Sequence, residues 1–385
     1  MKACPIFPPY CQASPPRVKR WLVAGAGGVL LVSNIVALVR PDVEAPLAWY
    51  AMIPGLAALW LLCLLFRWLF YRFARHNAWI YQQQVEWVQQ CWWHKHRQQI
   101  ALAESVLVGA RGTTPEQWLR VTNQSHGHGC PEPIKETQGQ AVRFLRSGAV
   151  DIEQREIQLA KVAVNQWQKQ RQDQPPLCCT PIHCYWLGSA TVWQEFVAQM
   201  AVQFPDVVLP AQPQYWRGID TLDEMIDLLN ATTGSKTTIL CAGCQCMVSE
   251  AESALPAGEA AFIWLLKKTG NVVLTRGEYF QAQDNEQVID VAARALVQAD
   301  ISQPPETCFL FSQPDEPALE KTGWNITQHV QDLNWGNIGG MEAVVVQTLA
   351  AISAENTGQP CGWLARDPQH TLTFGIVKSY GTARE

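Results

Sequence analysis

The sequence predicts an α/β domain preceded by a two-helix transmembrane hairpin, and three observations lead to this prediction. Two long apolar runs without charges stand near the start of the chain. Helical and strand-like hydrophobic patterns alternate over the remainder, which is typical of an α/β fold. The composition is that of a folded protein, since 48% of the 385 residues are hydrophobic and only 16% are charged.

Charge and cysteine content exclude several classes of protein. The formal net charge is -5, and a nucleic-acid binder would need a basic face that the later part of the chain does not supply. The 13 cysteines are odd in number and scattered, which favours reduced, buried thiols over a disulfide framework. We therefore expect no nucleic-acid partner.

The first part of the chain reads as a membrane anchor. Residues 1–16 are rich in Pro and Cys, and we predict a disordered tail there. The uncharged segments 21–39 and 45–66 are each long enough to cross about 30 Å of hydrocarbon as a helix. They predict a transmembrane hairpin over residues 17–76.

Basic residues flank the hairpin on one side only. Arg17, Lys19 and Arg20 precede the first apolar segment, and Arg67, Arg72 and Arg75 follow the second, whereas the connecting residues 40–44 carry one Arg and two acids. By the positive-inside rule both termini and the main domain are expected in the cytoplasm of a bacterium, with the anchor in the inner membrane.

The anchor is followed by a predicted amphipathic juxtamembrane helix over residues 77–105. Its Trp and Val residues recur at roughly helical spacing, and its high aromatic content favours contact with a membrane or a partner. The α/β domain is then expected to occupy residues 106–385.

Within that domain, strand and helix patterns follow one another. The first half contains predicted strands at 106–108, 178–187, 207–209 and 238–241, and predicted helices at 151–171, 191–204 and 215–229. The second half contains a predicted helix at 287–299, a strand at 307–311, a short helix at 324–330, a glycine-rich turn entering a helix at 334–353, and a hairpin of 362–365 with 371–377.

One stretch, residues 255–268, is expected to be a tight turn that leads into a buried strand. Pro256 and Gly258 form the turn, and Glu259, Ala260 and Ala261 open the strand before a run of large apolar residues. Small residues there let another backbone approach closely.

The order of these motifs resembles the thiolase-like fold of the β-ketoacyl synthases. The likeness covers about residues 200–380, and it rests on the 215–229 helix, the small-residue end of the 238–243 strand, the 255–268 motif and the final turn, helix and hairpin. It implies a layered thiolase-like fold. The first half, residues 106–214, is too short for the usual pattern and is expected to be compressed.

The same resemblance implies that catalysis has been lost. In that family the nucleophilic Cys stands at the amino end of the helix that begins here near residue 218, where this chain has Tyr215, Trp216 and Arg217. A family His precedes the final helix, where Gly336 and Asn337 stand, followed by Gly339 and Gly340. We therefore expect a degenerate site with no catalytic residue and no cofactor.

The cysteines leave two other hypotheses open. An enzyme of acyl chemistry could use Cys178, Cys184 or Cys241 in an altered site, and the Cys241-x-x-Cys244-x-Cys246 spacing resembles part of a metal site. Buried structural thiols are the expected explanation for both patterns.

The predicted function is that of a membrane-anchored, non-catalytic binding or adapter protein. A membrane anchor joined to a degenerate thiolase-like domain is similar in layout to accessory and adapter proteins of bacterial type VI secretion. The expected partners are the lipid bilayer and a protein, such as a secretion component or an effector, and a homo-oligomer is left open. The alternative is a membrane-associated acyl-transfer or condensing enzyme.

Overall fold

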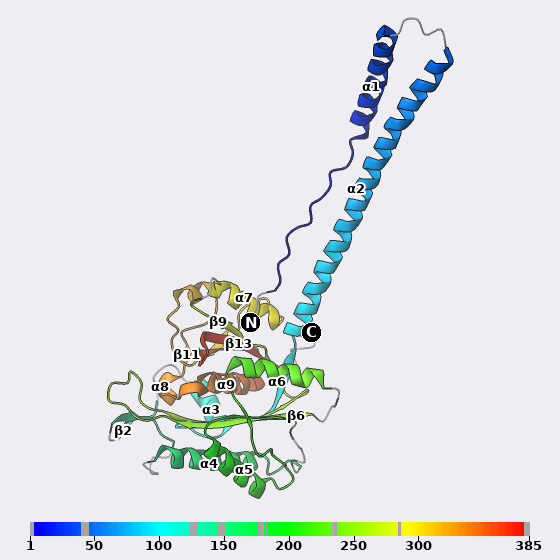
Figure 1. Cartoon of the computed structure of the whole chain (residues 1–385). Helices are drawn as coiled ribbons and strands as arrows, with labels where there is room; N and C mark the ends of the chain where they lie inside the picture. The colour runs from blue at the N-terminus through cyan, green and yellow to red at the C-terminus, as the bar shows by residue number, and fades with distance from the viewer. Residues whose placement is uncertain are drawn as a thin grey trace. The chain divides into compact units, whose positions relative to one another are not determined.

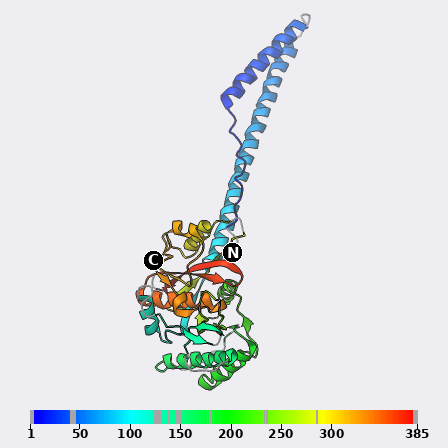
Figure 2. The same cartoon turned by 90° about the vertical axis from the view of Figure 1, so that its left-hand side faces the viewer.

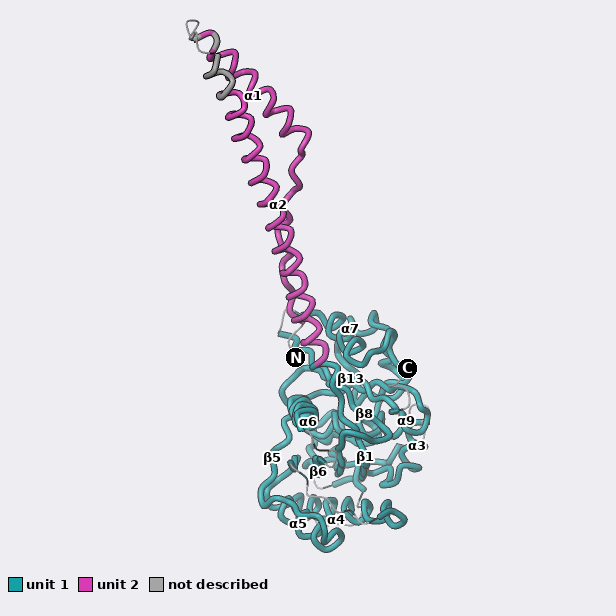
Figure 3. Tube along the Cα trace, turned by 90° about the vertical axis from the view of Figure 1, so that its right-hand side faces the viewer, with its two compact units in different colours: residues 1, 95–385 teal, residues 2–94 magenta. Residues whose placement is uncertain are grey.

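The protein was analysed as a computed structural model, which describes residues 4–39, 46–123, 130–136, 138–144, 151–175, 177, 181, 183–232, 234, 237–283 and 286–380. The chain divides into two compact units (Figure 3). In chain order we call Lys2–His94, drawn in magenta as unit 2, the first or helical unit, and Lys95–Glu385 together with Met1, drawn in teal as unit 1, the second unit. We describe each unit by itself.

The first unit is built on two helices, α1 (Val18–Val39) and α2 (Pro46–His96). Trp60 of α2 packs against Gly25 of α1, and its Nε1 donates a hydrogen bond to the carbonyl oxygen of Trp21 at 2.9 Å. Among the described residues one helix, Met52–His96, is long and apolar enough to cross a membrane, and none of its most apolar window is buried inside the protein.

The segment before α1 has no helix or strand in its described part and runs along α2. The Tyr81 hydroxyl donates to the carbonyl oxygen of Pro8 at 2.9 Å, and Arg67 Nη2 donates to that of Ser14 at 3.1 Å. The contacts progress in opposite directions along the two segments, so this tail is antiparallel to α2. The sequence predicted disorder here, whereas the described tail residues have defined contacts.

The second unit begins with a strand, not with a continued helix. β1 (Gln99–Gly109) starts three residues after α2 ends at His96. The juxtamembrane helix therefore covers 77–96 and not 77–105, and the predicted 106–108 strand is the end of a longer one. The apolar spacing that resembled a helix here belongs to a strand buried on both faces.

The remaining elements confirm the alternating α/β pattern (Figure 1). In the first half they are α3 (Pro115–Asn123), β2 (Ile134–Glu136), β3 (Gly139–Ala141), α4 (Ile152–Gln170), β4 (His183–Leu187), α5 (Ala190–Gln203), β5 (Gln214–Tyr215), α6 (Ile219–Ala231), β6 (Thr238–Cys246) and β7 (Glu259–Lys267). In the second half they are β8 (Val272–Thr275), β9 (Glu278–Phe280), α7 (Val288–Gln298), β10 (Thr307–Leu310), β11 (His329–Val330), α8 (Asp332–Trp335), α9 (Glu342–Thr357), β12 (Cys361–Asp367) and β13 (His370–Ser379).

The strands form an 11-stranded sheet that contains the same arrangement twice. Its order is β11-β10-β12-β13-β8-β1-β7-β6-β4-β5, with β9 beside β13. The sheet strands of the first half are β1, β4, β5, β6 and β7, and those of the second half, without β9, are β8, β10, β11, β12 and β13. Numbered one to five along the chain in each half and read from the outer edge of the sheet inward, both sets have the order third, second, fourth, fifth, first. The first half is thus complete, which corrects the expectation of a compressed one. The short β5 and the loop-rich segment before β4 hid its strands in the sequence.

Helices fill three layers around these strands (Figures 1 and 2). Helices α6 and α9, each following the third strand of its half, lie in the central layer with α3. Helices α4 and α5 cover the outer face of the first half, and α7 covers that of the second. Helix α9 is buried on all sides from Ala343 to Ala354, as expected for the innermost helix of a layered fold.

Candidate functional site

The candidate site lies where the amino ends of the two central helices meet the β12–β13 turn. Helix α6 is preceded by Gly218, whose φ of 73° lies in the left-handed region that favours glycine. Ile219 and Thr221 of the first turn are 4% and 0% exposed. An exposed helix N-terminus attracts anions, but this one is covered by the protein itself.

The group that covers α6 is the carboxylate of Asp367, at the end of β12. Its Oδ2 accepts a hydrogen bond from the backbone N–H of Ile219 at 2.9 Å, and its Oδ1 accepts one from the N–H of Gln369 at 2.9 Å. A Cβ added at Gly218 would lie 1.9 Å from Asp367 Oδ2. A side chain at residue 218 and the Asp367 carboxylate therefore exclude each other.

A second carboxylate, that of Glu342, stands in the first turn of α9. Burial raises its pKa to about 7, while the charge of Arg366 and a hydrogen bond from the Arg366 backbone oppose the shift. Its Oε2 is buried and has no hydrogen-bond partner among the described residues. Arg366 and Asp367, the last two residues of β12, thus contact the amino ends of both central helices.

The glycine-rich turn of the predicted degenerate site packs against the 255–268 motif. The N–H of Gly258 donates to the carbonyl oxygen of Asn337, and the N–H of Asn337 donates to that of Pro256, both at 2.7 Å. Gly336 has a φ of 69°, and a Cβ there would lie 2.4 Å from the Pro256 oxygen. The 255–268 motif and the glycine-rich turn, which lie far apart in the sequence, therefore contact each other directly.

The same turn also reaches the β12–β13 turn. Gly339 has a φ of 57°, the N–H of Gly340 donates to Gln245 Oε1 at 3.1 Å, and a Cβ at Gly340 would touch Pro368 at 3.6 Å. At the position where the resembled family has a His, Asn337 Oδ1 accepts a hydrogen bond from the N–H of Gly339 at 3.0 Å, so this side chain stabilises the turn itself.

Of the residues predicted at the nucleophile position, none points a reactive group at the α6 terminus. Tyr215 is 57% exposed at the sheet edge, and Arg217 pairs with Glu224 at 2.9 Å on the surface. Trp216 packs edge-on against Trp264, with ring centroids 6.2 Å apart. The site is closed by residues that are not among its sequence-predicted positions, namely Gly218, Asp367 and Glu342. A Gly directly before a helix and an Asp-Pro turn are the sequence signals that could have indicated them.

Large aromatic rings fill the layer behind this site. Trp335 stacks on Trp118 with ring centroids 5.0 Å apart, and both are 1% exposed. Trp264, Phe262 and Trp363 lie in the same cluster and are at most 1% exposed. Side chains therefore occupy the space between the central helices and the strands around these rings.

Glu259 of the 255–268 motif is a buried structural anchor. Its carboxylate accepts hydrogen bonds from Arg155 Nε at 3.0 Å, from Arg155 Nη2 at 2.9 Å and from the N–H of Phe144 at 2.6 Å. Arg143 approaches it to 4.0 Å and also pairs with Glu136. Ala260 and Ala261, both 0% exposed, continue the strand into the core. The motif holds α4 and the β2–β3 segment on the sheet.

The candidate cysteines do not form a reactive site in the described part of the chain. Cys184, Cys241, Cys244 and Cys246 are at most 4% exposed. Burial raises the pKa of the Cys241 and Cys244 thiols well above their usual value, and that of Cys246 to about 12. Cys178 lies outside the described residues.

The cysteines of β6 are also on opposite faces of the strand. Cys241 belongs to the central cluster, whereas Cys244 and Cys246 belong to the cluster under α4 and α5. Among the residues that the structure describes, no group of three or more His, Cys, Asp and Glu side chains could hold a metal ion. The metal-site hypothesis for this spacing is therefore not supported by the geometry.

Solved ketosynthase structures have the same fold. The chain matches the ishigamide ketosynthase/chain length factor with 12% sequence identity and a TM-score of 0.52, over 73% of this chain and 99% of that one. It matches a ketosynthase in complex with its chain length factor from Xenorhabdus doucetiae with 10% identity and a TM-score of 0.50, over 73% and 98%. No protein-family model and no curated protein sequence matches the chain. The second unit is thus a thiolase-like α/β domain.

Proposed function

We propose that this chain is a membrane-anchored, non-catalytic thiolase-fold protein that acts as a binding or adapter component. The observation that carries the proposal is the Asp367 carboxylate at the amino end of α6. A nucleophile at that position would need the helix terminus to stabilise its negative charge. The terminus already holds a carboxylate of the chain itself, so a thiolate there would meet a like charge.

The anchor half of the proposal places α1 and α2 across the bacterial inner membrane, with both termini and the α/β domain in the cytoplasm. The length and composition of α2 support it, as do the basic residues on one side of both apolar segments. The resemblance in layout to type VI secretion adapters makes secretion-sheath, spike or effector proteins the partners to test, and self-association is a further arrangement to test.

A pull-down of the tagged full chain from native membranes tests the binding function. We expect a secretion component or an effector to be recovered with the tagged chain. It should not be recovered from control membranes in which the chain carries no tag. Recovery of acyl carrier protein in its place would contradict the adapter proposal.

The second candidate is a membrane-associated acyl-transfer or condensing enzyme. Two observations favour it: the solved structures with this fold that we compared are ketosynthases, and burial raises the pKa of Glu342 to about 7, a value that suits a general acid or base. An enzyme of this kind needs a nucleophile, and Cys178 is the candidate cysteine that lies outside the described residues.

Intact-mass measurement separates the two candidates. The full chain and its Cys178→Ser variant are incubated with acyl-carrier and acyl-CoA thioesters. We expect no covalent acyl adduct on either protein. An adduct on the unmodified chain that disappears in the variant would establish the enzyme and overturn the non-catalytic proposal.

A further inference from the structure

The basic residues around the two apolar segments lie at one level of the helical unit. Trp60 of α2 bonds to the carbonyl oxygen of Trp21, and Arg67 bonds to that of Ser14. Residues 17–20 stand between these two contacts, so they lie beside residues 60–67 of α2. We call Arg17, Lys19, Arg20, Arg67, Arg72 and Arg75 together the basic collar.

The collar spans about 20 Å along the helix axis, at a rise of about 1.5 Å per residue. Arg17, Lys19 and Arg20 lie beside residues 60–67 of α2, and Arg75 lies about 12 Å beyond Arg67. The headgroup region on each side of a bilayer is about 5 to 8 Å thick. Arginine and lysine side chains extend along apolar surface to place their charges at a polar boundary, so charges from backbone positions on either side of one headgroup layer can reach it.

The sequence leaves the charge of the collar uncompensated. Residues 1–41 and 45–85 contain no Asp or Glu, and the first acid of this part of α2 is Glu86. None of the collar residues forms an ion pair among the described residues. A concentration of positive charge without internal partners is complementary to an anionic surface.

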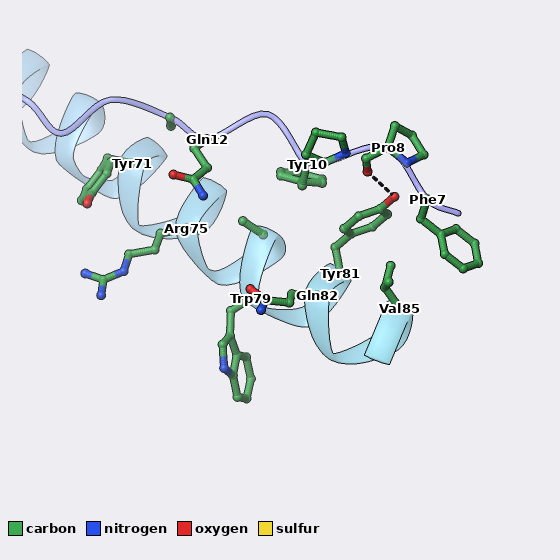
Figure 4. Close-up of a pocket in the computed structure, with 13 residues that line it drawn as sticks. Phe7, Pro8, Tyr10, Gln12, Tyr71, Arg75, Trp79, Tyr81, Gln82 and Val85 are labelled. Carbon is green, nitrogen blue, oxygen red and sulfur yellow. Dashed lines mark hydrogen bonds between the residues drawn. The ribbon is translucent and has the colours of Figure 1, made fainter. Parts of the chain in front are cut away.

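Exposed aromatic rings accompany these cations. The Arg72 guanidinium lies 5.6 Å from the ring of Trp68, and that of Arg67 lies 5.8 Å from the ring of Phe70. Trp68 and Phe70 are 45% and 64% exposed. Figure 4 shows the tail along one side of α2, with Arg75 and Trp79 reaching outward. Rings beside cations are typical of the boundary between hydrocarbon and headgroups.

We propose that the basic collar binds the headgroups of anionic phospholipids in the leaflet from which α2 emerges. This rests on the proposed anchoring and adds to it a preference for lipid class. The guanidinium groups offer paired N–H donors to the phosphate oxygens. An anionic headgroup has a net negative charge that attracts the collar, whereas the phosphate of a zwitterionic headgroup is neutralised by the headgroup's own cation.

The test measures which lipid the full chain retains. The protein in neutral detergent micelles is given equal amounts of phosphatidylglycerol and phosphatidylcholine, captured, washed, and its lipids are quantified by mass spectrometry. We expect phosphatidylglycerol to be enriched about fivefold or more. The variant with Arg67→Gln, Arg72→Gln and Arg75→Gln lacks three of the six collar cations, and its enrichment of phosphatidylglycerol should fall to about half or less of that of the unmodified chain.

A matched variant controls for total charge. Arg217→Gln, Lys161→Gln and Lys169→Gln remove the same charge from the second unit and should keep the preference. Equal retention of both lipids by the unmodified chain, or an unchanged preference in the collar variant, would overturn the proposal. So would displacement of phosphatidylglycerol by millimolar inorganic phosphate at constant ionic strength, because that result identifies a site for free anions.

The anchoring itself is tested separately. Membranes that contain the unmodified chain or the collar variant are extracted with alkaline carbonate, and both proteins are expected to stay in the pellet. Release of both proteins would remove the anchoring proposal, whereas retention without any lipid preference would remove only the inference about the collar.

Discussion

Asp367 and Glu342 connect the end of β12 to the amino ends of α6 and α9 at the candidate site. Asp367 satisfies an N–H group at the start of α6 that would otherwise be buried without a partner. The carboxylate of Glu342 accepts a hydrogen bond from the backbone of Arg366, the residue before Asp367. At the scale of single residues, the contacts that close the site are ones whose loss should be measurable as stability.

Removal of the Asp367 carboxylate should destabilise the fold. We expect Asp367→Ala to lower the free energy of unfolding by about 1 to 2 kcal/mol, as loss of an N-terminal helix cap does. Asp367→Asn keeps an oxygen acceptor and should cost less. Thermal unfolding of the full chain in detergent checks both variants, and an alanine variant as stable as the unmodified protein would argue against the capping role.

Glu342 should make stability depend on pH. Its folded-state pKa of about 7 exceeds the ordinary value of 4.5 for a glutamic acid, so the unfolded chain releases this proton first as pH rises. The stability that the protonated group contributes is present below about pH 4.5 and is lost towards pH 7. Glu342→Gln, which stays neutral, should therefore be more stable than the unmodified chain at pH 8, by at most about 3 kcal/mol.

The difference between these two proteins should shrink to less than about 1 kcal/mol at pH 5, because the folded-state carboxyl is then protonated and the unfolded-state one only partly ionised. The comparison uses unfolding curves at both pH values. Glu306→Gln, at an exposed position, serves as the control, and an equal gain at pH 5 and pH 8 would show that titration of Glu342 is not the cause.

Glu259 should be the most sensitive of the acidic residues named here. Glu259→Gln removes the negative charge that pairs with the buried Arg155, and breaking a buried ion pair costs about 3 to 5 kcal/mol. The exposed Glu252→Gln should change the free energy of unfolding by less than about 0.5 kcal/mol. Similar losses in both variants would contradict the anchor role of Glu259.

At the scale of elements, the burial of β6 explains why we expect its cysteine thiols to be unreactive. Its residues alternate between the central layer and the layer under α4 and α5, so its thiols face different apolar clusters. Iodoacetamide should label the exposed Cys11 and Cys91 at least about tenfold faster than Cys241, Cys244 and Cys246, because the thiolate is the reactive form. Peptide mapping checks the rates, and fast labelling of a β6 thiol would revive a cysteine-based enzyme.

The elements also show how far the sequence could lead. The strand of 255–268, the helix of 215–229 and the turn before α9 were predictable because each has a strong local pattern of glycine and apolar residues. The contact of Gly218 with Asp367 was not, since it joins residues 149 positions apart through a turn whose location depends on the whole sheet. The start of β1 was misplaced because a strand buried on both faces lacks alternation.

At the scale of the whole molecule, the repeated strand order gives the two central helices equivalent places. The order was invisible in the sequence because the halves share topology without sharing residues, and β5 and β11 are only two residues long. In the fold, Gly218 and the 336–340 turn precede corresponding helices. Arg366 and Asp367, adjacent residues of β12, therefore contact residues at the amino ends of both helices.

The position of β1 has a consequence for biosynthesis. It is the first strand of the domain to leave the ribosome, directly after α2, yet its partners are residues 260–267 and 272–275. Until those residues have been translated, a hydrophobic strand beside the growing membrane segment has unpaired edges, which are prone to aggregate. Pairings of such long sequence separation also form slowly. Under the proposed anchoring, insertion of the apolar helices is thus expected to come before folding of the domain, so that the nascent chain is tethered at the bilayer while its sheet is still incomplete.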